Sequence, residues 1–321
     1  MPHAIKPLTF KPHRLDGLSQ RLLDSHYENN YGGAVRRLNA IDQQLAGLDP
    51  AAAPTFVLNG LKREQLVAAN SAVLHEIYFD GLGGSGGDPD GDLAGALEQD
   101  YGSVARWRLE FVAMGKALAG GSGWALLCWS AQLGRLMNQW AADHTHCLAG
   151  GDVLLALDMY EHAYHLDFGA NAGAYVDAFM RNVRWPAVAT RLRQARGGAA
   201  PVESASPILP EIAVEELRAM LEHGDPVAVL DVRMADDFEV ARDMVRDARH
   251  VDPEHIAGAA GGLPRDRPTA VYCVYGFHVS RDAVAELRTH GIDARVVSGG
   301  IAAWHAMGGK TVPKPGATAA A

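Results

Sequence analysis

The sequence lacks cysteine clusters, long apolar runs and runs of basic residues. Its 321 residues include only three cysteines, Cys128, Cys147 and Cys273, which are too few and too scattered for a disulfide framework or a cysteine zinc site. The longest apolar run, VLLAL at 153–157, is far shorter than the roughly 20 residues that a membrane-spanning helix needs. The first residues, MPHAIKPLTF, hold no secretory apolar segment. These absences predict a cytoplasmic protein without a membrane span.

The charge balance argues against polyanionic partners. The chain carries 29 Lys and Arg against 38 Asp and Glu, a formal net charge of −9, with no cluster of basic residues. Neither nucleic acid nor an anionic membrane is therefore expected as the main partner. With 48% hydrophobic and 21% charged residues the chain is typical of a globular protein, and its length predicts about two domains.

A segment of small, polar and proline residues, RGGAAPVESASP at 196–207, has the composition of a flexible linker. We place the main boundary there. The predicted divisions are a helical hairpin at 1–90, a mixed helix and strand domain at 91–196, a linker at 197–207, a second domain at 208–315 and a tail at 316–321.

The part before the linker is expected to be an α+β domain. Apolar residues recur with helical spacing over 15–49 and 64–79, which predicts two long helices in an antiparallel hairpin. The glycine-rich segment 81–91 lacks the lysine of a phosphate-binding loop and is interpreted as a plain connection. A further helical stretch covers 93–119, and the runs WALLCW and VLLALD predict buried strands at 124–129 and 153–158.

The part after the linker alternates between helical and strand patterns. Strands are predicted at VAVLDVR, AVYCVY and ARVV, and helices at VEELRAML, VSRDAVAELRTH and IAAWHAM. Such alternation is typical of an α/β domain built on a parallel sheet.

The segment DMYEHAYH at 158–165 places a carboxylate and an imidazole four residues apart, where a buried strand is expected to pass into a helix. At the start of a helix, the side chains of Asp158 and His162 would reach one point, as a metal chelate requires. The same residues also fit an ordinary helix start, with Asp158 capping the first turn, Glu161 reaching back and His162 in the core.

Two further histidines favour the metal interpretation. His26 lies on the first predicted helix and His75 near the end of the second, so antiparallel packing would bring them to one level. With Asp158 and His162 they make three nitrogen donors and one oxygen donor. This set suits iron or manganese cycling between the +2 and +3 states; zinc could bind it too, but offers no redox chemistry.

With these residues the chain resembles iron/manganese superoxide dismutases over residues 1–196. The matching segments are SHYENNYGGAVRRLN with His26, LHEIYF with His75, GSGW from Gly121 to Trp124, DMYEHAY with Asp158 and His162, and a V-x-W context for Trp185. The resemblance implies four metal ligands, supporting roles for Trp124 and Trp185, and dismutation of superoxide to dioxygen and hydrogen peroxide at one bound iron or manganese.

The resemblance also implies a proton-handling residue beside the metal. His144, in an Asp-His pair ahead of the DMYEHAY segment, is our candidate, and Gln139, in an Asn-Gln pair, is the alternative. Glu161 is implied to bridge to the partner subunit's ligand histidine, so a homodimer is expected.

Several positions depart from the family pattern. Asn30 and Ala34 stand where a histidine and a gateway tyrosine are usual, Tyr160 replaces the tryptophan of the signature, and His165 replaces an interface tyrosine. Tyr31 precedes Ala34 by three residues, so both lie on about the same helix face. We hypothesise that Tyr31 supplies the missing hydroxyl.

Cys273 lies where a buried strand is expected to pass through a glycine-containing loop into a helix, a setting that favours the thiolate. A small buried core residue is the alternative, and it is our interpretation of Cys128 and Cys147. Residues 208–315 resemble a rhodanese-like sulfurtransferase domain, with LDVR at 230–233, the loop CVYGFH with Gly276 and His278, and SGGIAAW at 298–304.

The rhodanese resemblance implies a persulfide on Cys273, received from a sulfane-sulfur donor. His278 replaces the usual loop arginine, and the segment after LDVR also departs, so thiosulfate binding is expected to be weak or dependent on pH. Two alternative functions stay open: a metal- and sulfur-binding stress or sensor protein with little turnover, and a protein that acts mainly as a sulfurtransferase.

Overall fold

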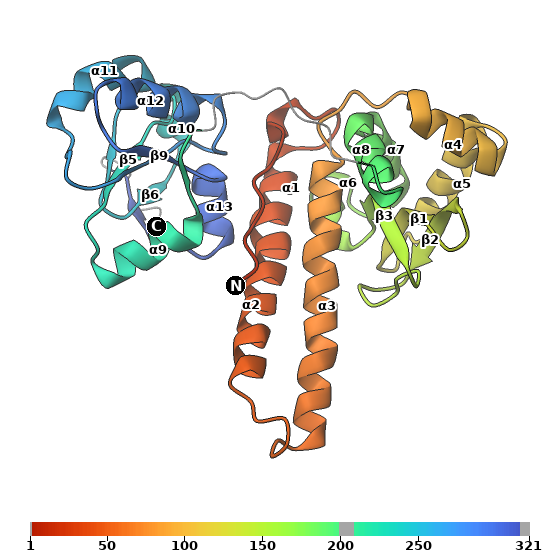
Figure 1. Cartoon of the computed structure of the whole chain (residues 1–321). Coiled ribbons are helices and arrows are strands. Elements are labelled where there is room, and N and C mark those ends of the chain that lie inside the picture. Colours follow the sequence, from red (N-terminus) through yellow and green to blue (C-terminus); the bar gives the residue numbers. More distant parts are fainter. Residues whose placement is uncertain (1, 199–208, 315–321) are drawn as a thin grey trace. The chain divides into compact units, whose positions relative to one another are not determined.

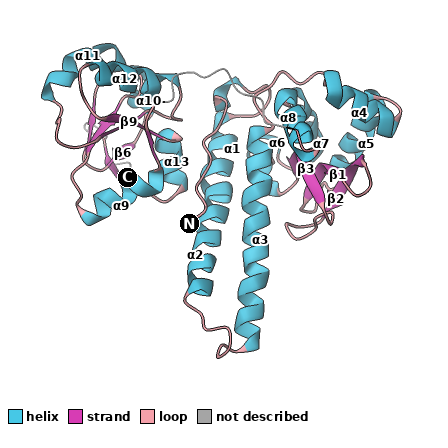
Figure 2. Cartoon of the chain, in the orientation of Figure 1, coloured by secondary structure: helices cyan, strands magenta, loops and turns pink. Residues whose placement is uncertain are grey.

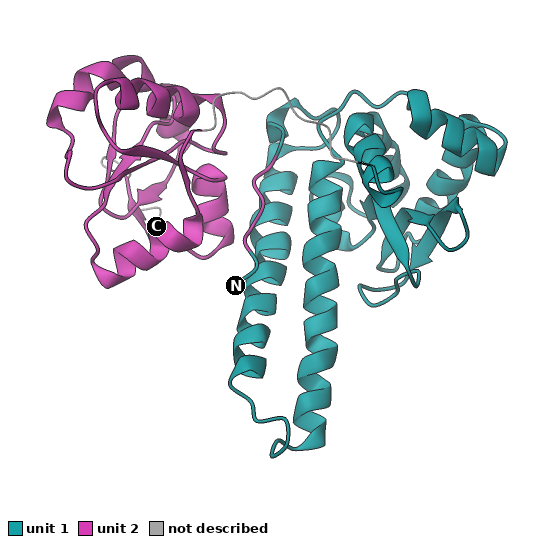
Figure 3. Ribbon diagram, viewed as in Figure 1, with its two compact units in different colours: residues 1–3, 9–203 teal, residues 4–8, 204–321 magenta. Residues whose placement is uncertain are grey.

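A computed structural model describes residues 2–198 and 209–314. The chain divides into two compact units, residues 1–3 with 9–203 and residues 4–8 with 204–321 (Figure 3). Most of the predicted linker, from 199 to 207, and the predicted tail at 316–321 lie outside the described residues. The domain boundaries given above therefore stay predictions.

The first unit begins with a helical hairpin (Figure 1). After a short turn, η1 (Pro12–Arg14), one continuous helix runs through α1 (Gln20–Ser25), a π-helical turn (His26–Tyr31) and α2 (Gly32–Ala46), and it packs against α3 (Thr55–Asp80). Ser19 begins the helix because its Oγ accepts a hydrogen bond from the Leu22 N–H at 3.1 Å. An apolar stripe with Leu38 and Ile41 on one helix and Ala68 on the other holds the hairpin together.

The π-helical turn is a feature that the sequence pattern did not predict. Residues 26–31 contain no helix-breaking proline or glycine, and we expected an ordinary α-helix there. In a π turn the hydrogen bonds join residues five apart, so His26 and Tyr31 lie on one side of the helix. Both rings accordingly contact Phe79 of α3, with centroid distances of 5.0 and 6.0 Å.

A three-stranded antiparallel sheet follows the hairpin, with strand order β2-β1-β3 (Figure 2). The predicted strands are present as β1 (Trp124–Ser130) and β3 (Gly151–Asp158). β2 (Arg135–Ala141) was not predicted, because RLMNQWA mixes polar and apolar residues on a half-exposed edge. The remaining helices of this unit are α4 (Gly91–Tyr101), α5 (Val104–Ala117), α6 (His165–Phe168), α7 (Ala172–Arg181) and α8 (Trp185–Ala195).

The predicted helix start at Asp158 is wrong. Asp158 is the last residue of β3, and its Oδ1 accepts a hydrogen bond from the Tyr160 N–H at 2.8 Å. This contact closes a tight turn, and a single 3-10 turn (Glu161–Ala163) follows, with no side-chain cap at its start. His162 therefore reaches Asp158 from a 3-10 turn instead of from an α-helix.

The second unit is an α/β domain with a parallel sheet, as predicted. Its strand order is β4-β9-β8-β5-β7, and every pairing in this sheet is parallel. The strands are β4 (Glu211–Ile212), β5 (Ala228–Asp231), β7 (Ala248–His250), β8 (Thr269–Tyr272) and β9 (Ala294–Val297), and a separate antiparallel pair joins β6 (Asp243–Val245) to β10 (Thr311–Pro313).

Helices complete this unit: α9 (Val214–His223), α10 (Ala235–Val240), α11 (Ile256–Ala259), α12 (His278–Thr289) and α13 (Gly300–Ala306), with single 3-10 turns at Pro253–His255 and Ala260–Gly262. The short elements β4, β6, β7, β10, α10 and α11 were not predicted, since segments this short carry little periodicity. The predicted fold class, an α+β region followed by an α/β region, is confirmed. Among the described residues, no helix combines the length and the hydropathy that crossing a bilayer requires.

Candidate metal centre

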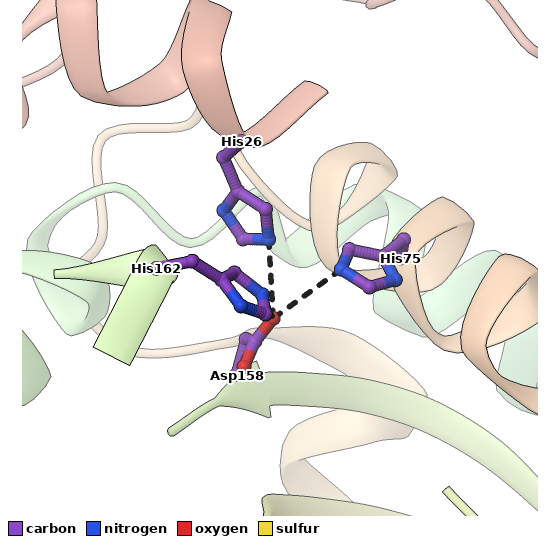
Figure 4. Close-up of side chains that lie close together, drawn as sticks. All are labelled: His26, His75, Asp158 and His162. Carbon is purple, nitrogen blue, oxygen red and sulfur yellow. Dashed lines mark hydrogen bonds and ion pairs between the residues drawn. The ribbon is translucent and has the colours of Figure 1, made fainter. Parts of the chain in front are cut away.

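Four side chains converge inside the first unit (Figure 4). The ligand atoms of His26, His75, Asp158 and His162 all lie within 4.8 Å of one another. The Asp158 Oδ2 atom is 3.1 Å from the Nε2 atoms of His26 and His162, and 3.5 Å from that of His75. The side chains of His26 and Asp158 are fully buried, whereas His162 is 26% exposed. His162 is therefore the most exposed of the four side chains.

Backbone contacts fix the orientation of two of these groups. Because Asp158 Oδ1 is occupied by the Tyr160 N–H, Oδ2 is the oxygen that faces the histidines. The Nδ1 of His75 lies 2.6 Å from the Ser71 carbonyl, one turn earlier in α3. A carbonyl can only accept, so Nδ1 carries the proton and a neutral His75 has its lone pair on Nε2.

Burial sets the charges of the cluster. It lowers the pKa of His75 to about 3 and also lowers the pKa of His26, so both rings are neutral near neutral pH. Burial alone would raise the pKa of Asp158, but its interactions with His162 and His26 outweigh burial and hold that pKa well below its usual value. The cluster therefore presents an ionised carboxylate to the neutral nitrogen donors of His26 and His75.

This arrangement fits a metal cation. The His75 lone pair points at an anionic oxygen, and His75 Nε2 has no hydrogen-bond partner among the described residues. Two electron-rich groups facing each other in a buried space are stable only with a positive charge between them. Three imidazole nitrogens and one carboxylate oxygen are a donor set that suits iron or manganese.

A column of stacked rings lies beside the ligands. The His144 and Tyr160 rings are 4.9 Å apart at 10°, and the Tyr160 and His162 rings are 5.5 Å apart at 17°. His144 Nδ1 accepts a hydrogen bond from Trp124 Nε1 at 3.0 Å, so a neutral His144 carries its proton on Nε2. Burial lowers the pKa of His144, which favours this neutral form.

The side-chain amide of Gln139, the alternative to His144, is hydrogen-bonded to the backbone of a neighbouring loop. Its Oε1 accepts from the Leu148 N–H at 2.9 Å, and its Nε2 donates to the His146 carbonyl at 2.7 Å. The loop that carries His144 is also tied to α3, since Asn70 Nδ2 donates to the His144 carbonyl at 2.6 Å. The choice between His144 and Gln139 stays a prediction, and the contacts favour His144.

Tyr31 lies next to His75. The two rings are stacked with centroids 6.2 Å apart, and the Tyr31 hydroxyl donates to Glu76 Oε1 at 3.1 Å. Tyr31 is 1% exposed and is therefore buried next to the cluster. Ala34, at the position where the family carries its tyrosine, is buried as well.

Two predicted residues remain, Trp185 and Glu161. Trp185 contacts the Trp107 ring at 5.6 Å and donates from Nε1 to the Gly87 carbonyl at 3.1 Å. Glu161 is exposed on the 3-10 turn that carries His162. Neither of these positions tests the role predicted for the residue.

In the second unit, Cys273 directly follows β8, at the carboxyl end of the parallel sheet. Its Sγ lies 3.3 Å from the Ser280 Oγ, and Ser280 donates to the Phe277 carbonyl at 3.2 Å. Gly276 turns the loop with φ +75°, and a Cβ there would lie 2.8 Å from the Gly299 nitrogen. His278 is the first residue of α12, so the thiol lies near the start of a twelve-residue helix.

Comparison with known proteins decides the family of the first unit. Residues 89–191 match the family model described as iron/manganese superoxide dismutases, C-terminal domain. The chain is 63% identical over 195 residues to the superoxide dismutase [Fe] of Cupriavidus metallidurans, covering 61% of this chain and 98% of that protein. The chain belongs to the iron/manganese superoxide dismutase family. Relatives of both metals support this: 33% identity over 201 residues with the superoxide dismutase [Fe] of Aquifex aeolicus, covering 60% of this chain and 93% of that protein, and 32% over 199 residues with the superoxide dismutase [Mn] 2 of Haloferax volcanii, covering 61% and 98%.

The superoxide dismutase region is followed by a second matched domain. Residues 213–307 match the family model described as rhodanese-like domain, and this span contains Cys273, Gly276 and His278. The predicted combination of a dismutase region with a rhodanese-like domain is confirmed.

Sequence reasoning missed residues that support the dismutase site through contacts distant in the chain. Glu76, His3 and Asn70 were not singled out, because nothing in their local sequence marks them. Ser280, which contacts Cys273, was missed too, although its position in the first turn of the helix after the loop could have indicated this contact.

Proposed function

We propose that this protein is a superoxide dismutase that uses one iron or manganese ion per chain. The observation that carries the proposal is the convergence of three histidine nitrogens on one oxygen of a buried carboxylate. Family membership supports the same assignment, and the 63% identical relative named as an iron enzyme favours iron. The overall reaction converts two superoxide anions and two protons into dioxygen and hydrogen peroxide.

When bound, the metal supplies one-electron oxidation of the first superoxide and one-electron reduction of the second. The chain supplies the rest. Asp158 provides the one anionic donor, and the buried side chains of His26 and His75 exclude water from all but the His162 side of the site. His144, with its proton on Nε2, is the residue proposed to hold a proton near the site.

Tyr31 is proposed to take the place of the family's gateway tyrosine. Its ring packs against His75, and the Tyr31 hydroxyl is held by Glu76, on the same side of the cluster. Trp124 and Tyr160 support His144 from its two sides.

We further propose a cytoplasmic homodimer. Glu161, His165 and Leu166 have exposed side chains and lie within four residues of the ligand His162, so a partner subunit could reach the site there. The described cysteines are all unpaired, which agrees with a reducing compartment. Neither nucleic acid nor a membrane is a proposed partner.

Metal analysis paired with a dismutase assay tests the main proposal. We expect one iron or manganese per chain and activity that rises in proportion to metal content. A fully loaded protein with no activity above that of the free metal would overturn it. That outcome would instead favour the alternative of a metal- and sulfur-binding stress or sensor protein.

A second function is proposed for the rhodanese-like domain: Cys273 accepts a sulfane sulfur. The Cys273 thiolate attacks the outer sulfur of thiosulfate, sulfite leaves with the electron pair of the broken bond, and a persulfide forms. The position of the thiol at a sheet end, before the helix α12, supports this proposal. Mass spectrometry of the full chain after thiosulfate treatment should find a gain of about 32 Da on Cys273, one sulfur atom.

Cys273→Ser is the matched control, and an equal mass gain in that variant would refute the assignment. The same variant separates the third alternative. The protein would be mainly a sulfurtransferase if sulfur transfer were the only strong activity of the parent and the Cys273→Ser variant left dismutation unchanged.

A further inference from the structure

A carboxylate lies unexpectedly close to the proposed metal site. Glu76 follows the ligand His75 in α3 and is 8% exposed. A buried carboxylate requires hydrogen-bond donors, because burial without them costs several kcal/mol. The Glu76 Oε1 atom meets the Tyr31 hydroxyl at 3.1 Å and His3 Nε2 at 2.6 Å.

His3 is itself held in place by α2. Its backbone N–H donates to Asn39 Oδ1 at 2.7 Å, and its carbonyl accepts from Asn39 Nδ2 at 2.9 Å. Both backbone groups of one residue are thus bound to a single side chain, which fixes the path of the segment at His3. The imidazole reaches from there across the hairpin to α3 and Glu76.

We propose that His3 and Glu76 are positioning residues that hold the Tyr31 ring against His75. The inference rests on the proposed function, because it concerns how a small anion approaches the metal that the proposed function requires. Each link joins residues far apart in the sequence: His3 to Glu76, Glu76 to Tyr31, and Tyr31 to His75.

The reason for such a device lies in the helix. Because the family's tyrosine position is Ala34, the hydroxyl comes instead from Tyr31, inside the π turn. A tyrosine ring that lost the hydrogen bond to Glu76 would have to be ordered each time an anion bound, and that ordering weakens binding. A structural alternative is that Glu76 only bridges the two helices of the hairpin.

Azide binding to the iron-loaded full chain distinguishes the two. Glu76→Gln removes the charge and keeps an oxygen that accepts from Tyr31, whereas Glu76→Leu removes the acceptor. Relative to Glu76→Gln, we expect Glu76→Leu to raise the azide Kd about fivefold, the cost of ordering one side chain. His3→Ala should raise it about twofold relative to the parent.

Double variants test whether the effect passes through Tyr31. In a Tyr31→Phe background, the Glu76→Gln and Glu76→Leu forms should bind azide equally, and His3→Ala should have no effect. Metal content and thermal unfolding are measured on each variant, so that Kd values are compared only among folded, loaded proteins.

Two results would overturn the inference: equal azide Kd values for Glu76→Gln and Glu76→Leu, or a difference that persists without the Tyr31 hydroxyl. If the proposed function itself is wrong, the result is different: the metal-loaded parent binds azide but does not dismutate superoxide.

Discussion

Among the described residues, each unit buries one carboxylate completely, and the two have opposite surroundings. Asp158 in the first unit faces three imidazoles, and the buried two are neutral near neutral pH. Asp231 in the second unit faces the Arg233 guanidinium, with Nε 2.9 Å from Oδ1, and accepts from the Tyr272 hydroxyl at 2.9 Å. Arginine is charged at every working pH, so Asp231 has its counter-charge within the chain.

The difference separates a binding site from a structural ion pair. Asp231 and Arg233 balance each other without any added ligand. Asp158 faces imidazoles and no permanently charged partner among its contacts, and one of these neighbours, His75 Nε2, has no hydrogen-bond partner among the described residues. A buried carboxylate among neutral donors therefore indicates a place for a cation, whereas a buried carboxylate on an arginine does not.

The largest expected effect comes from removing the charge of Asp158. Asp158→Asn should lose the bound metal and reduce dismutation to background, because the only anionic donor is gone. The metal-free variant should be no less stable than the metal-free parent, since an unbalanced buried charge has been removed. Metal analysis, activity and thermal unfolding check these points; a variant that keeps one metal per chain and full activity would contradict the ligand assignment.

Breaking the ion pair of the second unit should have a different result. Arg233→Met leaves Asp231 buried without its cation and should destabilise that unit by about 3 to 5 kcal/mol. Hydrogen exchange of β5 and β8 in the full chain measures this. Arg281→Met is the control: it breaks an exposed pair with Glu211, both side chains being 42% exposed, and should cost less than about 1 kcal/mol. Equal effects of the two variants would remove the distinction drawn above.

The polar residues around Asp158 should affect catalysis more than stability. His144→Leu is expected to lower dismutation by about 10- to 100-fold while metal content is retained, as for other residues that support a metal site. Gln139→Leu, its matched control, should change activity by about twofold at most after correction for metal content. The reverse order of these two effects would assign proton handling to Gln139.

The smallest effect is expected from a substitution in the rhodanese-like loop. It tests whether this loop lacks a permanent positive charge, such as the one that Arg233 supplies to Asp231. His278→Arg should raise sulfur transfer from thiosulfate about tenfold at neutral pH, because a guanidinium adds a charge-assisted hydrogen bond. Steady-state kinetics with thiosulfate measure the change. The same substitution combined with Cys273→Ser should show no transfer, and an unchanged rate in His278→Arg alone would show that this position does not contact the donor.

The proposed ligands could be selected from the sequence because they lie in contiguous, recognisable segments. The helical hairpin and the parallel sheet were predictable for a related reason, since long periodic runs determine element type. β2 was missed because an edge strand tolerates polar residues, as its sequence RLMNQWA illustrates.

Other features depend on contacts that no local pattern encodes. The helix start expected at Asp158 was wrong because one side-chain oxygen took the Tyr160 N–H and closed a turn. Glu76 and His3 meet across 73 positions of sequence, and either residue alone is an ordinary polar residue. The stacking of Tyr160 between His144 and His162 likewise depends on where the fold brings the loop of His144.

The π turn at His26–Tyr31 sets the rotational phase of the helix on which it lies. One added residue turns everything that follows by about 100° relative to an uninterrupted α-helix. His26 is therefore in phase with Tyr31 and with the apolar stripe of Leu38 and Ile41 only with that extra residue. Deleting one residue between 27 and 30 would set His26 out of phase with Tyr31 and the stripe, which both follow the deletion, so the length of this turn is as much a part of the site as its side chains.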